Sequence, residues 1–214
     1  MDNAQRPTTM TSHAVTTVAE LEALYAQPAA PSLAKQVDHL HPHYRAFIEA
    51  APFCLLSTVG GQWAECSPRG DAPGFVQVLD ERTLLMPDRR GNNRIDSLRN
   101  IVADPRVGLL FVIPGINETI RVNGTAQISV DPALIARCLV DGKAPTTVLV
   151  IRVEAVFFQC ARALIRSRLW AADAQVARNT LPSNGEILAT LSQNAIDGAA
   201  YDRDLPERQR TTLY

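Results

Sequence analysis

The sequence lacks both the long apolar run of a membrane-spanning helix and the pattern of an export signal. Its first residues, MDNAQRPTTMTSHAV, contain no basic segment followed by an apolar stretch, which is how a secretory signal begins. No window reaches the roughly 18 consecutive apolar residues that a membrane span requires. We therefore expect a cytoplasmic protein with no membrane partner and with reduced thiols.

Paired cysteines and regularly spaced histidines are also missing. The cysteines are Cys54, Cys66, Cys138 and Cys160, and no two of them form a CxxC pair. All four histidines lie between His13 and His43, without the spacing of metal ligands. Structural zinc sites depend on such short, regular spacings. The sequence therefore predicts no metal site.

Lysine is scarce and the net charge is small. The formal net charge is −1, and only Lys35 and Lys143 are lysines among 21 basic residues. Nucleic-acid-binding proteins normally cluster positive charge on one surface, so nucleic acid is not expected as a partner. An excess of arginine suits forked recognition of phosphate or carboxylate. A GC-rich genome gives the same bias and explains most of it.

The common phosphate-binding loops are absent, and the strand patterns follow one another directly. There is no GxGxxG and no GxxxxGK[ST], which a doubly wound sheet with a nucleotide site would carry. Strand patterns occur at 53–59, 62–70, 74–80, 82–88, 106–115, 118–129 and 146–160. They predict six or seven strands joined by hairpins. We expect a mainly β chain with added helices, arranged as an antiparallel barrel.

Helical patterns surround and interrupt these strands. They occur at 16–28, 38–53, 92–103, 131–142 and 185–194. Thr17 and Glu20 form a capping box, and Asn92 with Asn93 is expected to cap the third helix. Asn123–Gly124 indicates a bulge within a strand. Residues 195–214 are expected to form a polar tail laid over a surface.

The stretch MPDRRGNNRIDSLRNI, Met86 to Ile101, gathers three arginines around a helix start. Arg89, Arg90 and Arg94 lie where the helix dipole is already positive, which is unfavourable unless an anion lies among them. Open backbone N–H groups and guanidinium forks together match a phosphate monoester. Arg69 ends a strand in SPRGDAPG, and RSRLW, 166–170, adds two more arginines.

Ordinary ion pairs are the simpler explanation for these arginines. Asp71, Asp88 and Asp96 are near enough in sequence to pair with them. Trp63 and Trp170 are likewise more often core anchors than platforms for a ligand. Ion pairing alone does not explain why three arginines surround one helix N-terminus.

The order of these segments resembles that of the pyridoxamine 5′-phosphate oxidase-like, FMN-binding split-barrel proteins. The resemblance covers residues 37–171 and rests on SPRGD, PDRRGNN, LRNIVADPRVGLLF, TIRVNGTAQI and RSRLW. It implies a six-stranded antiparallel split β-barrel and a homodimer with FMN at the subunit interface. The chain then divides into an N-terminal tail and helix (1–36), the FMN-binding barrel (37–171), and a C-terminal helix and tail (172–214). The last segment would pack on the barrel or on the partner subunit.

The same resemblance implies which residues contact FMN. Two segments match the contacts to the phosphate, the ribityl chain and the isoalloxazine, and a third reaches the cofactor across the dimer. These residues are Ser67, Pro68, Arg69, Pro87, Asp88, Arg89, Arg90, Asn92, Asn93, Arg94, Arg166, Ser167 and Trp170. The apolar stretch Val148–Phe158 is expected to build the dimer seam.

The implied function is that of an FMN-dependent oxidoreductase. A hydride would move between the flavin and a small organic substrate or NAD(P)H; no catalytic side chain is identified. After Trp170 the chain lacks the basic, histidine-containing motif of authentic pyridoxamine phosphate oxidases, so vitamin B6 oxidation is in doubt. The alternatives are a non-catalytic protein of the same fold that binds flavin, haem or a deazaflavin, and arginines that only form surface ion pairs.

Overall fold

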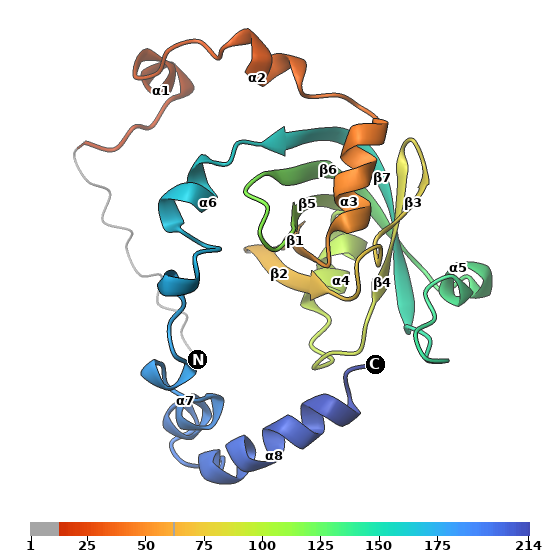
Figure 1. The fold of residues 1–214 in the computed structure, drawn as a ribbon, viewed down its shortest axis with the longest axis vertical. Helices are drawn as coiled ribbons and strands as arrows, with labels where there is room; N and C mark the ends of the chain where they lie inside the picture. The colour runs from red at the N-terminus through yellow and green to blue at the C-terminus, as the bar shows by residue number, and fades with distance from the viewer. Residues whose placement is uncertain (1–12, 62) are drawn as a thin grey trace. The chain divides into compact units, whose positions relative to one another are not determined.

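The computed structural model describes residues 13–61 and 63–214 (Figure 1). The chain divides into two compact units, Met1–Lys35 and Gln36–Tyr214. The described part of the first unit contains two short helices, α1 (Val18–Ala23) and α2 (Ala30–Ala34). The predicted capping box is confirmed at α1, where Thr17 is the N-cap and Glu20 bonds back to it. Helix α2 was not predicted from the sequence; Pro31 lies in its first turn, where its missing N–H is tolerated.

The second unit is built on one antiparallel sheet of seven strands (Figure 1). The strands are β1 (Phe53–Val59), β2 (Ala64–Gly70), β3 (Gln77–Asp80), β4 (Thr83–Asp88), β5 (Arg106–Val112), β6 (Thr119–Ser129) and β7 (Thr147–Gln159). Their order across the sheet is β2-β1-β5-β6-β7-β4-β3. The expectation of a mainly β chain with added helices is therefore confirmed.

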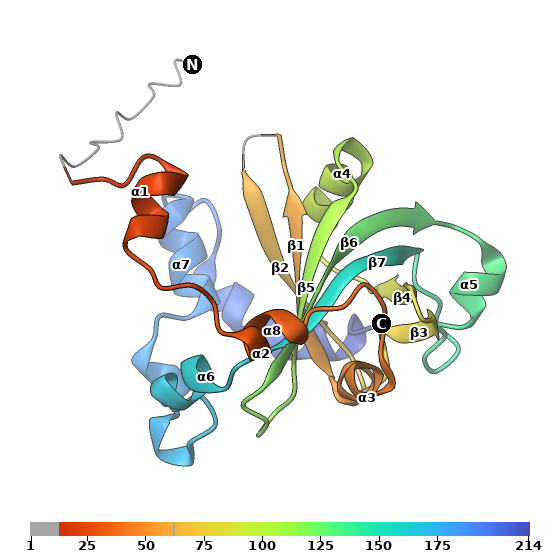
Figure 2. The same cartoon turned by 90° about the horizontal axis from the view of Figure 1, so that it is seen from above.

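The expected count of six strands in a barrel is corrected, because the sheet has seven strands and does not close. Its outermost strands are β2, which pairs with β1, and β3, which pairs with β4. Strand β3 has only four residues, and Pro68 in β2 has no N–H to donate to a further neighbour. Such short or proline-containing strands are typical of sheet edges. Figure 2 shows how the sheet curls between these two edges.

The core lies on the inner face of this curled sheet. Buried and more exposed residues alternate along β1 and β5, as expected for strands with one covered face. Strand β7 contributes a row of buried side chains, namely Val148, Leu149, Ile151, Val153 and Val156. The chain's own core therefore uses these five side chains, whereas Phe158 near the end of β7 is 39% exposed. The expected dimer seam over Val148–Phe158 stays a prediction.

Two helices cover this core. Helix α3 (Pro42–Ala50) contacts β3, β6 and β7 and buries Ile48, whereas α4 (Asp96–Ala103) contacts β1 and β6 and buries Ile101. The predicted bulge at Asn123–Gly124 is confirmed by a register shift between β6 and β7. The contacts of α4 with β1 and β6 place its first turn beside the part of the sheet that carries β1 and β2.

Helix α4 begins at Asp96 and not at Asn92, so the predicted asparagine cap is wrong. Its N-cap is Ile95, in the left-handed conformation with a φ of 52°. The Asn92 side chain instead accepts a hydrogen bond from the Arg94 amide at 3.1 Å. Asparagine side chains often close such local turns, and this turn keeps Asn92 and Asn93 outside the helix.

The chain after α4 contains four more α-helices among the described residues. They are α5 (Pro132–Ala136), α6 (Arg162–Ser167), α7 (Asn184–Leu191) and α8 (Gly198–Thr211), with short 3-10 turns at Ala172–Ala174 and Arg178–Thr180. Asp131 caps α5 as predicted, but α5 ends well before Gly142. None of the described helices is both long and apolar enough to cross a membrane.

The expectation of a polar tail after residue 194 is wrong, because α8 occupies most of it. Asp197 caps α8, and Asp202 accepts hydrogen bonds from the Ser183 hydroxyl and the Gly185 amide of the α7 start. Helix α8 is thus held by polar contacts with α7. A helix of this kind has little apolar periodicity, which explains why the sequence pattern did not show it.

Candidate functional site

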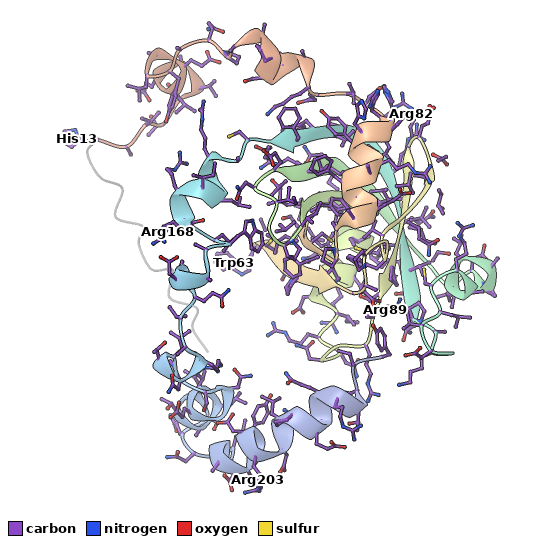
Figure 3. All side chains as sticks on the ribbon, viewed as in Figure 1. His13, Trp63, Arg82, Arg89, Arg168 and Arg203 are labelled. Atoms are coloured by element: carbon purple, nitrogen blue, oxygen red, sulfur yellow. The ribbon has the colours of Figure 1, made fainter. Side chains whose placement is uncertain are left out.

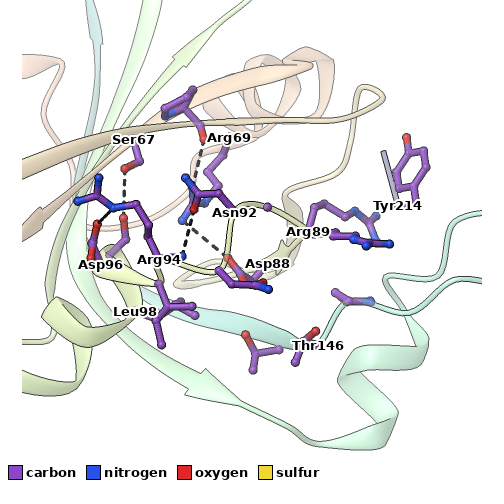
Figure 4. A pocket seen from close by; sticks show the side chains of 18 of the residues that line it. Ser67, Arg69, Asp88, Arg89, Asn92, Arg94, Asp96, Leu98, Thr146 and Tyr214 are labelled. Carbon is purple, nitrogen blue, oxygen red and sulfur yellow. Dashed lines mark hydrogen bonds and ion pairs between the residues drawn. The ribbon is translucent and has the colours of Figure 1, made fainter. Parts of the chain in front are cut away.

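A pocket opens where the ends of β2 and β4 meet the first turn of α4 (Figure 4). Its volume is about 820 Å³, which lies in the range of small-molecule sites. Two further segments complete its wall: Lys143–Thr147, which leads into β7, and Tyr214, which follows α8. The pocket therefore joins four parts of the chain that are far apart in sequence.

Most of the predicted FMN contacts meet in this pocket. Nine of them line it, namely Ser67, Pro68, Arg69, Asp88, Arg89, Arg90, Asn92, Asn93 and Arg94. Pro87 lies beside them in β4, buried and paired with Val148, and is not part of the wall. Arg166, Ser167 and Trp170 do not line it.

Arg89 is the most tightly held of the pocket's arginines. Its Nε donates to Asp71 Oδ2 at 2.6 Å, and its Nη1 donates to the backbone carbonyl of Cys138 at 2.6 Å. The side chains of Asp71 and Arg89 are 2% and 16% exposed. Arg89 leaves the sheet at the end of β4 (Figure 3), and these contacts fix its guanidinium at the base of the wall.

Both carboxylate oxygens of Asp71 accept hydrogen bonds in this cluster. Its Oδ1 accepts hydrogen bonds from the Ala72 amide and from the Tyr214 hydroxyl, each at 2.7 Å. Burial raises the pKa of the Asp71 carboxyl, but the hydrogen bonds from Tyr214, Ala72 and Arg89 outweigh it, so this pKa lies below its usual value. The hydrogen bond to Asp71 in turn raises the pKa of Tyr214.

Arg69 and Asp88 form a looser pair in the pocket wall. Arg69 Nη2 lies 3.7 Å from Asp88 Oδ1, and both side chains are 22% exposed. Arg69 Nε and the Thr147 hydroxyl are buried without a hydrogen-bond partner among the described residues. Burial raises the pKa of Asp88, and the nearby Arg69 charge only partly offsets this. Unsatisfied buried donors are uncommon in folded proteins and often mark a place where a ligand or water belongs.

The remaining cations lie at the pocket's outer edge. Arg94 pairs with Asp96 at 2.8 Å, and the Arg94 side chain is 75% exposed. Arg90 and Lys143 are exposed, and their side chains make no hydrogen bond or ion pair within residues 13–61 and 63–214. The wall therefore contains five basic side chains, Arg69, Arg89, Arg90, Arg94 and Lys143, but only two carboxylates, Asp88 and Asp96.

The start of α4 adds backbone donors to this positive charge. No side chain caps the helix, so the N–H groups of its first turn have no side-chain partner where Ile95 to Leu98 line the pocket. The Ser97 hydroxyl donates to the Ser67 hydroxyl at 3.3 Å. Asn93 and Ile95 both have positive φ, 60° and 52°, and a β-branched residue in this region is strained. Together these features can bind an anion.

The third predicted segment lies elsewhere in the same chain. Trp170 Nε1 donates to the carbonyl of Ile116 at 2.9 Å, and the Ser167 hydroxyl donates to the carbonyl of Leu164 at 3.0 Å. Trp170 is half-buried. Trp63, beside the start of β2 (Figure 3), is 74% exposed, so the expectation of a core anchor is wrong for that residue.

Sequence reasoning missed Lys143 and Tyr214 as pocket residues. Lys143 is one of only two lysines, but nothing near it in sequence carries a ligand motif. Tyr214 lies 143 positions from Asp71, and only the packing of α7 and α8 brings it there. No group of three or more metal-ligating side chains occurs among the residues that the structure describes.

Comparison with known proteins identifies the family. A model of the family described as pyridoxamine 5′-phosphate oxidase matches residues 40–160. HupZ from Group A Streptococcus is similar in structure, with 20% identity and a TM-score of 0.45, over 55% of this chain and 92% of that one. General stress protein 26 from Bacillus anthracis shows 19% identity and a TM-score of 0.36, over 53% and 88%.

A protein related to general stress protein 26 from Clostridium acetobutylicum, of the pyridoxinephosphate oxidase family, shows 12% identity and a TM-score of 0.43. The match covers 55% of this chain and 85% of that one. No curated protein sequence matches. Because the family model spans more than half of the sequence, the chain belongs to the pyridoxamine 5′-phosphate oxidase family.

Proposed function

We propose that this chain is an FMN-binding oxidoreductase that transfers a hydride between the flavin and a small organic substrate or NAD(P)H. The observation that carries this proposal is the pocket at the uncapped start of α4, where five basic side chains face two carboxylates in the wall and a third, Asp71, behind Arg89. An excess of positive charge combined with open amide groups suits a phosphate dianion. Membership in the pyridoxamine 5′-phosphate oxidase family adds support.

The ion pairs do not cancel this charge. Each of the paired arginines has an aspartate beside it, as the simpler explanation predicted: Asp71 for Arg89, Asp88 for Arg69 and Asp96 for Arg94. Arg90 and Lys143, however, have no carboxylate partner among the described residues. The buried Arg69 Nε also lacks an acceptor. An anion would supply what these groups lack.

The pocket also offers surfaces for the rest of the cofactor. Pro68, Ile95, Leu98 and Pro145 give apolar contacts, which a flat ring needs for cover. The hydroxyls of Ser67 and Ser97 lie 3.3 Å apart and provide polar contacts next to these groups. When bound, the flavin supplies the hydride and electron chemistry. The residues of this chain would bind and orient it.

We further propose a homodimer in the cytoplasm, with each site shared between two subunits. Arg166, Ser167 and Trp170 do not reach the pocket of their own chain. Ile165 and Leu169, in and just after α6, are more than half exposed, and exposed apolar side chains of this kind are common at interfaces. The α6 region would then complete the partner's pocket.

Binding is tested by titrating ligand-free protein with FMN and with riboflavin, following flavin fluorescence. We expect FMN to bind at least about tenfold more tightly than riboflavin, because only FMN carries the phosphate. A purified protein that is yellow agrees with this expectation. Equal affinity for the two flavins, or binding of neither, would contradict the proposed anion site.

Turnover is tested on the FMN-loaded protein. We expect NAD(P)H or one of a panel of small amines to bleach the flavin band near 450 nm, followed by recovery in air. No bleaching by any reductant favours the second candidate, a non-catalytic flavin-binding protein. Titration with haem and with a deazaflavin covers its other ligands.

Site sharing is tested by mixing subunits. If each pocket combines Arg94 of one subunit with Arg166 of the other, a mixed dimer of Arg94→Ala and Arg166→Ala chains contains one intact site. We therefore expect purified mixed dimers to regain up to half of the FMN binding that each variant loses. Failure to regain binding in a dimer of proven mixed composition would contradict the shared site.

A further inference from the structure

The end of the described chain reaches back to the pocket. Thr212, Leu213 and Tyr214 follow α8, and Tyr214 lines the pocket wall. Its hydroxyl donates to Asp71 at 2.7 Å, and its ring lies beside the Arg89 guanidinium, 5.5 Å from ring centroid to Cζ (Figure 4). Tyr214 therefore touches both partners of the Asp71–Arg89 pair.

This contact determines which part of Arg89 is left for a ligand. Arg89 uses Nε on Asp71 and Nη1 on the Cys138 carbonyl. Its Nη2 has no hydrogen-bond partner within the described ranges 13–61 and 63–214. Because the other two nitrogens are fixed, the direction in which Nη2 points is fixed too.

Asp71 is the group through which Tyr214 acts. The Asp71 amide donates to the Pro52 carbonyl at 3.0 Å, which anchors the residue at the base of β1. Arg89 donates a hydrogen bond to Oδ2 of its carboxylate, whereas Tyr214 and Ala72 donate to Oδ1. Loss of the tyrosine hydroxyl would leave Oδ1 with only the Ala72 amide and would weaken the hold on the carboxylate. A nearly buried carboxylate that loses a donor also pays a desolvation cost.

We infer that Tyr214 is a positioning residue for the pocket: through Asp71 and its own ring it holds Arg89 so that Nη2 faces the bound anion. This inference rests on the proposed function, since the anion is the FMN phosphate. Tyr214 itself need not touch the ligand. A residue brought by the α7–α8 pair thus sets the affinity of a site built mainly on β2, β4 and α4.

The test compares Tyr214→Phe and Tyr214→Ala with wild-type protein in titrations with FMN and riboflavin. Tyr214→Phe removes only the hydroxyl, and we expect it to weaken FMN binding roughly threefold to tenfold. Tyr214→Ala also removes the ring beside Arg89, and we expect a larger loss. Neither variant should change riboflavin binding. Equal losses for FMN and riboflavin would overturn the inference, because they would mean that Tyr214 contacts the flavin ring directly.

Tyr201→Phe is the matched control. Tyr201 also lies in α8, packs against Arg208 at 4.3 Å from ring centroid to Cζ, and does not line the pocket. We expect this variant to bind both flavins as the wild type does. A loss of FMN binding in Tyr201→Phe equal to that in Tyr214→Phe would overturn the specific role of Tyr214.

A second measurement needs no flavin and separates this inference from the proposed function. Trypsin can cut after Arg208 and Arg210 near the end of α8, and contact of Tyr214 with Asp71 should slow that cleavage. We expect Tyr214→Phe to be cut several times faster there than wild type and Tyr201→Phe. Unchanged cleavage overturns the inference whether or not FMN binds. Faster cleavage in a protein that binds no FMN removes the proposed function and, with it, the positioning role, and leaves only the contact.

Discussion

Arg89 and Arg94 line the same pocket but lie in very different surroundings. Arg89 is almost buried, and its side chain bonds to Asp71 and to the Cys138 carbonyl. Arg94 is 75% exposed and has only the neighbouring Asp96. Buried ion pairs are costly to break, whereas exposed pairs contribute little to stability. We therefore expect Arg89 to contribute both to the fold and to the proposed site, and Arg94 to contribute to binding alone.

The strongest challenge to this comparison is Arg89→Ala. It leaves the Asp71 carboxylate, 2% exposed, without its cation, so we expect the free energy of unfolding to fall by about 3 kcal/mol. Urea denaturation followed by circular dichroism measures this loss. Arg94→Ala is the control and should change stability by less than about 0.5 kcal/mol. Similar stability for the two variants would contradict the distinction.

Arg94→Ala should instead affect the binding of FMN. We expect it to weaken FMN binding by about 1–3 kcal/mol, the range of a charge-assisted contact, and the same range applies to Arg89→Ala where that variant folds. Fluorescence titration gives the dissociation constants. Arg106→Ala is a matched control, because Arg106 is similarly exposed, 69%, and pairs with Asp104 beyond the other end of α4. Unchanged affinity in both pocket variants would count against the site.

Asp88→Asn should change FMN binding less than Arg94→Ala does, and it should strengthen binding instead of weakening it. Asp88 lies 3.7 Å from Arg69, and its charge opposes an anion in the pocket. We expect the isosteric amide to bind FMN roughly threefold more tightly, since the carboxylate charge in the wall is removed. Because burial raises the pKa of Asp88 in the folded protein, its ionisation costs stability as pH rises through that pKa. At neutral pH the variant should therefore be no less stable; weaker FMN binding would contradict this assignment.

Acid unfolding should show the smallest of these effects, and it tests the buried Asp71–Arg89 pair. The folded-state pKa of Asp71 lies below its ordinary value of 3.8. Its contribution to stability is thus present above that ordinary value and is lost as pH falls through the lower, folded-state pKa. We expect the wild type to lose stability in this acid range more steeply than Arg89→Ala. Urea midpoints measured from pH 5 to pH 2 provide the test, and parallel curves would contradict it.

Much of the fold was predictable because its signals are local. Apolar runs and one alternating segment predicted the strands, Thr17 and Glu20 predicted the α1 cap, and Asn123–Gly124 predicted the bulge. The start of α4 was not, because the Asn92 side chain bonds to the Arg94 amide and Ile95 takes a left-handed conformation. Helix α8 was missed since polar contacts with α7, and not an apolar stripe, hold it.

The candidate site divides in the same way. The arginines near α4 could be found because three like charges in six residues are visible in sequence. Asp71 and Asp88 could be proposed as their partners. Which aspartate pairs with which arginine could not be assigned, because it depends on the conformation of the turn after β2. Tyr214 could not be found at all, because its contact with Asp71 spans 143 positions and depends on the packing of two helices.

The crossing of α7 and α8 connects the pocket to positions far from it in the fold. A methyl group at Gly185 would overlap the carbonyl oxygen of Gly198, and one at Gly198 would overlap that of Gly185. Neither position can accept even alanine without pushing the two helices apart, and α8 leads directly to Tyr214. If Tyr214 positions Arg89 as inferred above, selection for ligand affinity should yield variants at the helix crossing as well as in the pocket wall.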